Sequence, residues 1–499
     1  MASVNHNAPQ LTVGQPHFQL LKSIESCLQK CGIAGYLVGG FVRDSILERD
    51  IEDIDIAVAA DSLGFSPELA HALNGKYIPM DKENKVARIV LKETSHGAVR
   101  HIDVSTIINN IEDDLSRRDF TLNAMAVPLK DIESAIGKAD IIDPFGGLSD
   151  VQQKILRVTC DSAFQADPLR LLRAARLSAE LGFAIEDSTE ELVKKHARMI
   201  TAVSGERIRE ELLKLLSLPK TGDLFLYLEE MGLLSAIMPE ILPSKGLEQP
   251  SEHYWDVFTH SIKTIDAVSY ILRRGDWQYS LKALEAVPWS DELEAYFNQK
   301  LSAGSTRLLL LKLTALLHDI AKPKMKFIDE NGKIRFYGHP KEGAPMAAEI
   351  MERLRFSSKE IMIVEEVTRH HLRPTQMTQM GIVTDHAIYR YFRDVGEVAI
   401  DTLFFTLADH LAARGPTLDE NNWIQHNQTV AYILEKHREQ ENKTAFPRLL
   451  SGEDIMAEFG LEPGPKIGEL LEAVREAQAT GEVSNKADAV DCIRRILAQ

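Results

Sequence analysis

Apolar positions follow two different patterns along the chain, one typical of strands and one typical of helices. Five short apolar segments in the first 150 residues have the length and residue types of strands: Tyr36–Val38, Ile54–Val58, Ala87–Leu91, His101–Val104 and Ala124–Val127. Helical stretches separate these segments. The pattern therefore predicts a compact head of the α/β or α+β class, and we expect an α+β fold with a mixed sheet.

After about Val151 the apolar residues recur every three or four positions, so only helices are predicted. The clearest helical patterns cover Asp167–Leu181, Ser188–Lys195, Gly205–Leu216, Arg307–Ile320 and Ala344–Leu354. Prolines near residues 239–250 and at Pro416 interrupt them. We therefore expect a head followed by three all-helical domains, at residues 1–150, 151–245, 246–415 and 416–499.

The composition is ordinary for a soluble globular protein, with 44% hydrophobic and 26% charged residues among 499. A net charge of −17 argues against coating of nucleic acid over the whole surface, but it allows a local basic groove. No apolar run reaches membrane-spanning length, and the N-terminus lacks the features of a signal peptide. Four cysteines without zinc-site spacing indicate reduced thiols, so we expect a cytoplasmic protein with no membrane partner.

The first candidate site begins where a predicted strand ends on two glycines, in LVGGFVRD at residues 37–44. Gly39 and Gly40 allow the backbone to approach a phosphate closely, and a helix that starts there directs its amides at the anion. Arg43 can add a charge-assisted contact. The segment therefore indicates a site for a nucleoside triphosphate.

Asp53 and Asp55 lie one residue apart on the next predicted strand, so both carboxylates belong to one face. Such a pair suits two Mg²⁺ ions in an in-line phosphoryl displacement. Asp103 alternates in the same way and is a candidate third carboxylate, with an exposed aspartate on an edge strand as the alternative. The alternative for the pair is a surface turn with solvated aspartates, which the upstream glycines disfavour.

Two arginine-rich segments complete this candidate site. In RRDFTLNAM, residues 117–125, the two arginines, Arg117 and Arg118, beside Asp119 can bind a triphosphate while Asn123 meets a ribose or base edge. The alternative is a surface ion network. In DPLRLLRAARLSAELGF, which begins at residue 167, a carboxylate and three guanidinium groups share one side of a predicted helix. These residues are Asp167, Arg170, Arg173 and Arg176. They can offer acceptors and donors to a base, or form an exposed, self-paired stripe.

Read together, these segments resemble the class II tRNA nucleotidyltransferases, the CCA-adding enzymes and their poly(A) polymerase relatives. Five family segments occur in order between about Tyr36 and Leu216: LVGGFVRD with DID, RRDFTLNAM, DPFGGLSDVQQKILR, DPLRLLRAARL and SGERIREELLKLL. Residues 450–478 resemble the family's C-terminal region, which implies contact with the body of tRNA. The resemblance implies a nucleotidyltransferase head followed by helical domains.

The resemblance also implies an activity and a role for each site residue. The tRNA 3′ hydroxyl would attack the α-phosphate of CTP or ATP with Mg²⁺ bound, which adds CMP and AMP and releases pyrophosphate. Metals would be held by Asp53 and Asp55, with Asp103 as a further catalytic carboxylate. The nucleotide would be held by Gly39, Gly40, Arg43, Arg118, Asp119 and Asn123, with Asp167 and Arg170 as the protein template and Arg173 and Arg176 beside them.

Two departures from the family pattern leave alternatives open. Ala166 stands where the family's template motif has a glutamate before the aspartate. The stretch between Asp103 and Arg117 is short, whereas full CCA-adding relatives carry a longer flexible loop there, implicated in the change from CTP to ATP. A CC-adding specialist and a poly(A) polymerase therefore remain alternatives to a complete CCA-adding enzyme.

A second candidate metal site lies in the third predicted domain. HSIK at residues 260–263, LLHDIAKP at residues 316–323 and a later aspartate resemble the HD phosphohydrolase superfamily. This implies a divalent metal held by His260, His318, Asp319 and Asp409, which His339 and His370 could extend, whereas we assign His371 to packing. An HD hydrolase with a decayed polymerase head is the alternative function.

Overall fold

The computed structural model describes residues 11–12, 15–51, 53–92, 99–132, 135–136, 141–280, 282–302, 304–379, 383–444 and 448–498. The chain forms two compact units. The first comprises Met1–Val203 with Met231–Ala236, and the second comprises Ser204–Glu230 with Ile237–Gln499.

A mixed six-stranded sheet organises the first unit, as the sequence predicts. Its strands are β2 (Gly35–Val38), β3 (Asp53–Val58), β4 (Lys76–Asp81), β5 (Val86–Val90), β6 (His101–Thr106) and β7 (Ala126–Pro128). Their order is β4-β5-β6-β3-β2-β7, with β3 and β6 parallel and the other neighbours antiparallel. The sequence analysis missed β4, an edge strand that contains Pro79, because proline is tolerated mainly at sheet edges.

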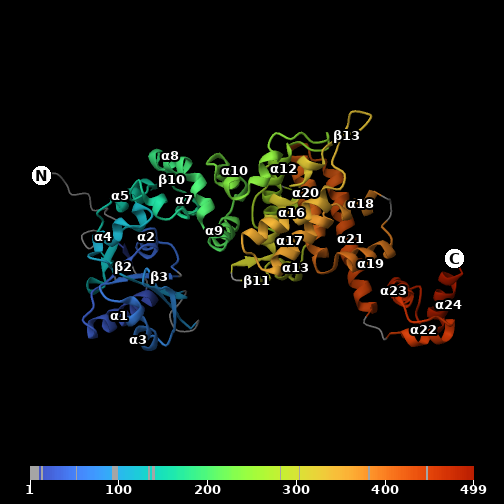
Figure 1. The fold of residues 1–499 in the computed structure, drawn as a ribbon, viewed down its shortest axis with the longest axis horizontal. Coiled ribbons are helices and arrows are strands. Elements are labelled where there is room, and N and C mark those ends of the chain that lie inside the picture. Colours follow the sequence, from blue (N-terminus) through green and yellow to red (C-terminus); the bar gives the residue numbers. More distant parts are fainter. Residues whose placement is uncertain are drawn as a thin grey trace. The chain divides into compact units, whose positions relative to one another are not determined.

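The two faces of the sheet differ in polarity. Ile54 and Ile56 of β3 are buried, while Asp53 at the start of the strand is exposed. Helix α3 (Ser62–Ala72) packs on β4, β5 and β6, and α1 (Gln15–Lys30) packs against α3 (Figure 1). The alternation of β3 therefore leaves its carboxylates on the face opposite its buried isoleucines.

Helices cover the rest of the first unit: α2 (Gly40–Ile46), α4 (Ile111–Ser116), α5 (Gly147–Gln153), α6 (Ala163–Ala166), α7 (Arg170–Leu181) and α8 (Asp187–His196). Helix α7 begins at Arg170 and not at Asp167 as predicted, because Pro168 disfavours helical backbone at the residue before it. Asp167 is extended, with φ −148° and ψ 102°.

The prediction that strands end at about Val151 was wrong in detail. Very short strands pair later in the chain: β9 (Ile155–Leu156) with β10 (Ala184–Ile185), β11 (Lys300–Ser302) with β12 (Ser305–Thr306), and β13 (Phe327–Ile328) with β14 (Ile334–Arg335). Strands of two or three residues are too short to produce a visible alternation. The remainder is mostly helical, as expected.

The second unit is a helical assembly. Its helices are α9 (Gly205–Ser217), α10 (Thr221–Glu230), α12 (Val257–Ile271), α13 (Asp291–Phe297), α14 (Arg307–Leu317), α15 (Lys322–Met325), α16 (His339–Arg353), α17 (Ser358–His370), α18 (Arg373–Gln379), α19 (Asp385–Val395), α20 (Ala399–Arg414), α21 (Glu420–Thr444), α22 (Gly452–Phe459), α23 (Pro465–Thr480) and α24 (Lys486–Leu497). Helix α14 is buried on all sides and contacts α12, α17 and α20, which Figure 1 labels. Among the described residues, no helix is both long and apolar enough to cross a membrane.

Candidate functional site

The sheet brings the three predicted carboxylates onto one face. In the register of β3 and β6, Asp55 lies beside Asp103, and Asp53 lies beside His101. Strand β6 is an internal strand, so the alternative of an edge-strand aspartate was wrong for Asp103. The structure therefore aligns the carboxylates on two neighbouring parallel strands.

Two basic side chains that the sequence analysis missed contact these carboxylates. Arg88 of β5 is paired in register with Asp103, and its guanidinium makes two hydrogen bonds of 2.7 Å to the carboxylate. His101 Nδ1 lies 3.1 Å from Asp53 Oδ1. The alternation of side chains along β5 and β6 places both residues on the face of the carboxylates. Only the register of the sheet shows which carboxylate each one contacts.

Asp55 is the most enclosed of the three carboxylates. The Gly40 N–H donates to Asp55 Oδ2 at 3.2 Å. Burial raises the pKa of Asp55, while the neighbouring Arg118 opposes this shift. A cation at this position would remove the cost of a buried negative charge.

Gly39 allows the backbone to pass close to this carboxylate. It has φ 66° and ψ −137°, a conformation open to glycine and strained for other residues. A Cβ atom at Gly39 would lie 2.8 Å from Asp55 Oδ2 and 3.1 Å from Arg118 Nη1. The glycine is therefore required by its conformation and by the space around it.

A buried network connects the glycine turn to the RRDFTLNAM segment. The Arg43 guanidinium donates to Asn123 Oδ1 at 2.8 Å and forms two further hydrogen bonds to Asp44. Asn123 Nδ2 donates to Asp119 Oδ1 at 3.0 Å, and Arg173 Nη1 lies 3.2 Å from Asp119 Oδ2. Four of the predicted nucleotide-binding residues, Arg43, Asp119, Asn123 and Arg173, are thus fixed relative to one another.

The charge of Asp119 is stabilised within this network. Burial alone would raise the pKa of Asp119, but Arg173, Asn123 and the Phe120 N–H together hold it below its usual range. Arg118, beside it in sequence, is paired with Asp114 at 3.1 Å. Asp119 therefore remains a carboxylate although it is buried.

The predicted template residues lie next to the same segment. Arg170 Nη2 donates to the main-chain oxygen of Arg117 at 2.6 Å, and its Nη1 lies 3.4 Å from that of Arg118. Asp167 Oδ1 accepts from the Leu169 N–H at 3.2 Å, ahead of the helix. Arg176 is paired with Glu180 at 2.6 Å, as the alternative of a self-paired stripe predicts.

Hard oxygen ligands are what Mg²⁺ prefers, so the donor set of Asp53, Asp55 and Asp103 fits this ion. In the described part of the chain, their oxygens do not converge within 4.8 Å of one another, as the ligand atoms of the second site do. Arg88 holds Asp103, and His101 faces Asp53. These contacts fix the orientation of two of the three carboxylates.

The second site gathers the ends and inner faces of five helices. Two groups of ligand atoms lie within 4.8 Å: His260, His318 and Asp409 form one, and Asp319, His339 and His371 form the other. His318 and Asp319 are consecutive, so the groups adjoin. The four predicted ligands and His339 therefore lie in one cluster.

His370 and His371 exchange the places that the sequence analysis gave them. His370 leaves the cluster and contacts Glu366 at 3.3 Å, whereas His371 Nε2 lies 3.3 Å from His339 Nε2. His371 keeps helical backbone angles (φ −56°, ψ −29°) and continues the buried face of α17 formed by Val364, Val367 and Thr368. The helical period therefore turns His371 inward and His370 away from the cluster.

The histidines of this cluster are oriented like metal ligands. Nδ1 of His318, His339 and His371 lies 3.0, 2.7 and 2.6 Å from the carbonyl oxygen three residues earlier, which leaves Nε2 facing the cluster. Nε2 of the buried His318 lies 3.1 Å from Asp319 Oδ2 and 3.6 Å from Asp409 Oδ1. Imidazole nitrogens and carboxylate oxygens that face one another in this way fit a divalent cation.

The electrostatics of the cluster favour positive charge. Burial opposes protonation, yet Asp319 and Asp409 raise the pKa of His318 to about 10. Burial lowers the pKa of His371 to about 3, so its imidazole stays neutral, the form that binds metals. Lys322 Nζ lies 2.6 Å from Asp319 Oδ2 and adds further positive charge.

Family models match most of the chain. The poly A polymerase head domain matches residues 35–157, and the RNA- and SrmB-binding site of polymerase A matches residues 182–244. The HD domain matches residues 257–414, and domain 2 of tRNA nucleotidyltransferases matches residues 419–492. The four matched segments follow one another along the chain, from the six-stranded sheet to the C-terminal helices.

Two relatives are similar over nearly their whole length. An A-adding tRNA nucleotidyltransferase of Deinococcus radiodurans is 32% identical over 92% of this chain and 94% of its own. A CC-adding tRNA nucleotidyltransferase of Geobacter sulfurreducens is 30% identical over 93% of each chain. The same degree of similarity thus extends to relatives that add different nucleotides.

Solved structures share the fold. A CCA-adding enzyme in complex with ATP has a TM-score of 0.62 at 22% identity, and the match covers 97% of this chain and 96% of the other. The Thermotoga maritima CCA-adding enzyme complexed with tRNA has a TM-score of 0.58 at 22% identity, with the same coverage. At this identity the likeness concerns the fold alone.

Proposed function

The chain belongs to the tRNA nucleotidyltransferase family, and from that premise we propose that it adds CMP and AMP to the 3′ ends of tRNA without a nucleic-acid template. The observation that carries the proposal is the register that aligns Asp53 and Asp55 with Asp103 beside the Gly39–Gly40 turn. A glycine turn and carboxylates on one face provide for a triphosphate and its metal.

In this proposal Asp53 and Asp55 hold Mg²⁺, with Asp103 as the third carboxylate. When bound, the metal would neutralise the charge that develops on the phosphates. Gly39 and Gly40 bring the main chain to the triphosphate, and Arg118 adds a charge beside Asp55.

The remaining residues orient the nucleotide. Asp119 and Asn123 are held rigidly enough to contact phosphate and ribose, with Arg43 and Arg173 as the groups that fix them. Asp167 and Arg170 serve as the protein template for the base. Positioning of this kind supplies much of the rate in nucleotidyl transfer.

The test is a product ladder on tRNA transcripts that end before the CCA, after the first C or after CC, incubated with CTP, ATP or both. Asp53→Ala should abolish addition, whereas Asp61→Ala, equally exposed at 55%, should retain it. Failure of the wild type to extend any transcript would refute the proposal.

The same ladder decides the nucleotide order. Only four residues separate β6 from α4, where full CCA-adding relatives carry the longer loop, and this favours the CC-adding alternative. The A-adding relative favours ATP addition to a transcript that ends in CC. A CC-adding enzyme adds two nucleotides to a transcript that ends before the CCA, and a complete CCA-adding enzyme adds three. An A-adding enzyme adds one nucleotide, to a transcript that ends in CC.

We also propose that the histidine cluster is a divalent-metal centre for phosphate-ester hydrolysis, the activity typical of HD phosphohydrolases. The buried Nε2 of His318, which faces the carboxylates of Asp319 and Asp409, favours this second function. A bound metal would supply a hydroxide at neutral pH. Lys322 contacts the Asp319 carboxylate and is itself fixed by Gln249.

Metal content and hydrolysis test this centre separately. Wild-type protein reconstituted with Mn²⁺ or Ni²⁺ should retain metal after desalting and hydrolyse bis-p-nitrophenyl phosphate, and His318→Ala should lose both properties. His370→Ala, next to the cluster but outside it, is the matched control. Retention of metal without hydrolysis would indicate a structural metal site.

A further inference from the structure

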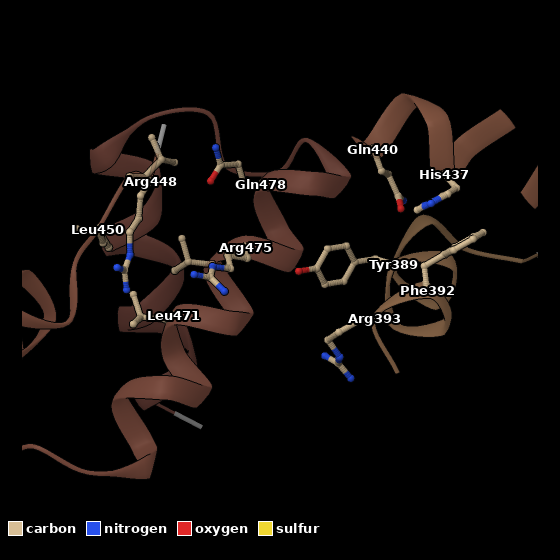
Figure 2. Close-up of a pocket in the computed structure, with 12 residues that line it drawn as sticks. Tyr389, Phe392, Arg393, His437, Gln440, Arg448, Leu450, Leu471, Arg475 and Gln478 are labelled. Carbon is tan, nitrogen blue, oxygen red and sulfur yellow. The ribbon is translucent and has the colours of Figure 1, made fainter. Parts of the chain in front are cut away.

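The second unit contains a cleft of about 560 Å³ that lies outside both proposed centres. Its walls come from α19, α21, α23 and the segment 448–450. Figure 2 shows Tyr389, Phe392, Arg393, His437 and Gln440 on one side, and Arg448, Leu450, Leu471, Arg475 and Gln478 on the other. The volume is within the range of about 300–1,000 Å³ that is usual for small-ligand sites.

Gln440 supplies an unsatisfied acceptor in this cleft. Only 4% of the residue is exposed, and its Nε2 donates to the main-chain oxygen of Asp385 at 2.9 Å. Because that partner can only accept, the amide orientation is fixed, and Oε1 is left buried without a hydrogen bond in the described chain. Such an orphaned oxygen is costly unless a ligand donates to it.

Flat and apolar surfaces lie beside this acceptor. The rings of Phe392 and His437 are stacked in parallel, with centroids 3.4 Å apart and an interplanar angle of 2°. Leu471 and Val474 of α23 line the opposite wall. A planar, partly apolar group with N–H donors on its edge matches these surfaces, and a nucleobase has this chemistry.

The charges of the lining residues favour an anion. Arg393, Arg448 and Arg475 line the cleft, and none of the described residues in its walls carries a carboxylate, although the chain has a net charge of −17. Arg393 is paired with Asp394 at 2.7 Å, and Glu472 at the margin lies 3.7 Å from Arg393 and 3.9 Å from Arg475. Arg448 and Arg475 therefore supply the donors for a phosphate.

We propose that this cleft binds one unstacked nucleotide, with the base between the aromatic and apolar walls and the phosphate at the arginines. The base donates an amino or imino N–H to Gln440 Oε1. The nucleotide is either a free monophosphate or an unpaired residue of an RNA chain, since both present the same chemistry. The proposal does not depend on the polymerase site.

Two probes distinguish these sources with the full chain: a fluorescein-labelled tRNA transcript and N-methylanthraniloyl-AMP, each titrated by fluorescence anisotropy. Arg448→Glu and Arg475→Glu should raise the Kd of one probe about tenfold or more, since a charge-assisted hydrogen bond contributes about 1.5–3 kcal/mol. If the two variants lose affinity for tRNA alone, the ligand is a nucleotide of an RNA chain. If they lose affinity for the monophosphate, the ligand is a free nucleotide.

Arg438→Glu is the matched control, because Arg438 lies exposed on α21 outside the cleft and pairs with Glu292. It makes the same change of charge and should alter neither Kd by more than about twofold. All three variants replace exposed side chains, so their melting temperatures should equal that of the wild type. Unchanged affinity of folded Arg448→Glu and Arg475→Glu for both probes would overturn the proposal, whether or not the chain extends tRNA.

Discussion

The guanidinium of Arg88 holds both carboxylate oxygens of Asp103, with Nε to Oδ1 and Nη2 to Oδ2 distances of 2.7 Å each. The two residues are directly opposed on antiparallel strands β5 and β6, and Asp55 lies beside Asp103 on β3. A fixed cation thus neutralises the third carboxylate of the row and sets its orientation. This arrangement makes Arg88 a positioning residue for the proposed polymerase site.

Replacement of Arg88 should therefore lower nucleotide addition without unfolding the head. We expect Arg88→Ala to reduce kcat by about 10- to 100-fold, the usual cost of losing a group that orients a metal ligand. Arg88→Lys keeps the positive charge but loses the bidentate geometry, so its kcat should lie between those of Arg88→Ala and the wild type. Single-turnover incorporation at several Mg²⁺ concentrations measures the effect. Equal rates for all three proteins would exclude a positioning role.

Gly39→Ala should be more damaging than its backbone conformation alone predicts. The added methyl group would lie 2.8 Å from Asp55 Oδ2, in addition to the strain of φ 66°. Gly396 has nearly the same conformation, φ 63° and ψ −137°, but a methyl group added there would meet no described atom within 4 Å, so Gly396→Ala isolates the strain. Strain alone costs about 1–3 kcal/mol. Urea unfolding should show the larger loss for Gly39→Ala, and only this variant should lose nucleotide addition.

Arg173→Met should destabilise the first unit, since it leaves the buried Asp119 carboxylate without its nearest cationic partner. Arg173 is 37% exposed, so solvent screens the pair and we expect a loss of about 1–2 kcal/mol.

The loss of stability in Arg173→Met should depend on pH. The depressed pKa of Asp119 stabilises the fold above the unfolded value of about 3.9, and this contribution disappears as the pH falls through the folded pKa. Urea unfolding should therefore show a larger difference from wild type at pH 7 than at pH 3. Arg176→Met, which removes an arginine paired with Glu180 on the same helix, should give a smaller difference.

His386 should make the stability of the second unit depend on pH. Its Nε2 lies 2.7 Å from Glu482 and its Nδ1 2.8 Å from Glu476, which also binds Arg390. The hydrogen bond to Glu482 is the main cause of a raised pKa for His386, which burial opposes. A raised pKa stabilises the fold below the unfolded value of about 6.5, and the contribution is lost as the pH rises through the folded pKa.

Thermal unfolding of His386→Gln at pH 5.5 and 8.5 measures this contribution. The wild type should exceed the variant in Tm at pH 5.5, and the difference should shrink at pH 8.5. His71→Gln replaces an exposed histidine of the first unit and should show the same difference from wild type at both values. If the Tm difference between the wild type and His386→Gln grew as the pH rises, a raised pKa for His386 would be contradicted.

The local sequence was sufficient to predict features that depend only on residues close together in the chain. The period of two in β3 correctly separated Asp53 and Asp55 from Ile54 and Ile56, because a strand places alternate side chains on opposite faces. Helices were predicted less well at their ends. Pro168 delays the start of α7, an effect that has no helical period. The inward position of His371 does follow the period of α17, but the sequence prediction assigned that position to His370.

The sequence by itself determined the mixed sheet of the head, the helical remainder, and the residue types of the two proposed metal-binding centres, because these depend on periodicity and on ligand chemistry. Only the tertiary structure decided which groups meet. Sheet register placed Arg88 against Asp103, and helix packing joined His371 to Asp319 and left Gln440 Oε1 unsatisfied in a cleft. Partners distant in sequence are selected by register and packing, which no local pattern encodes.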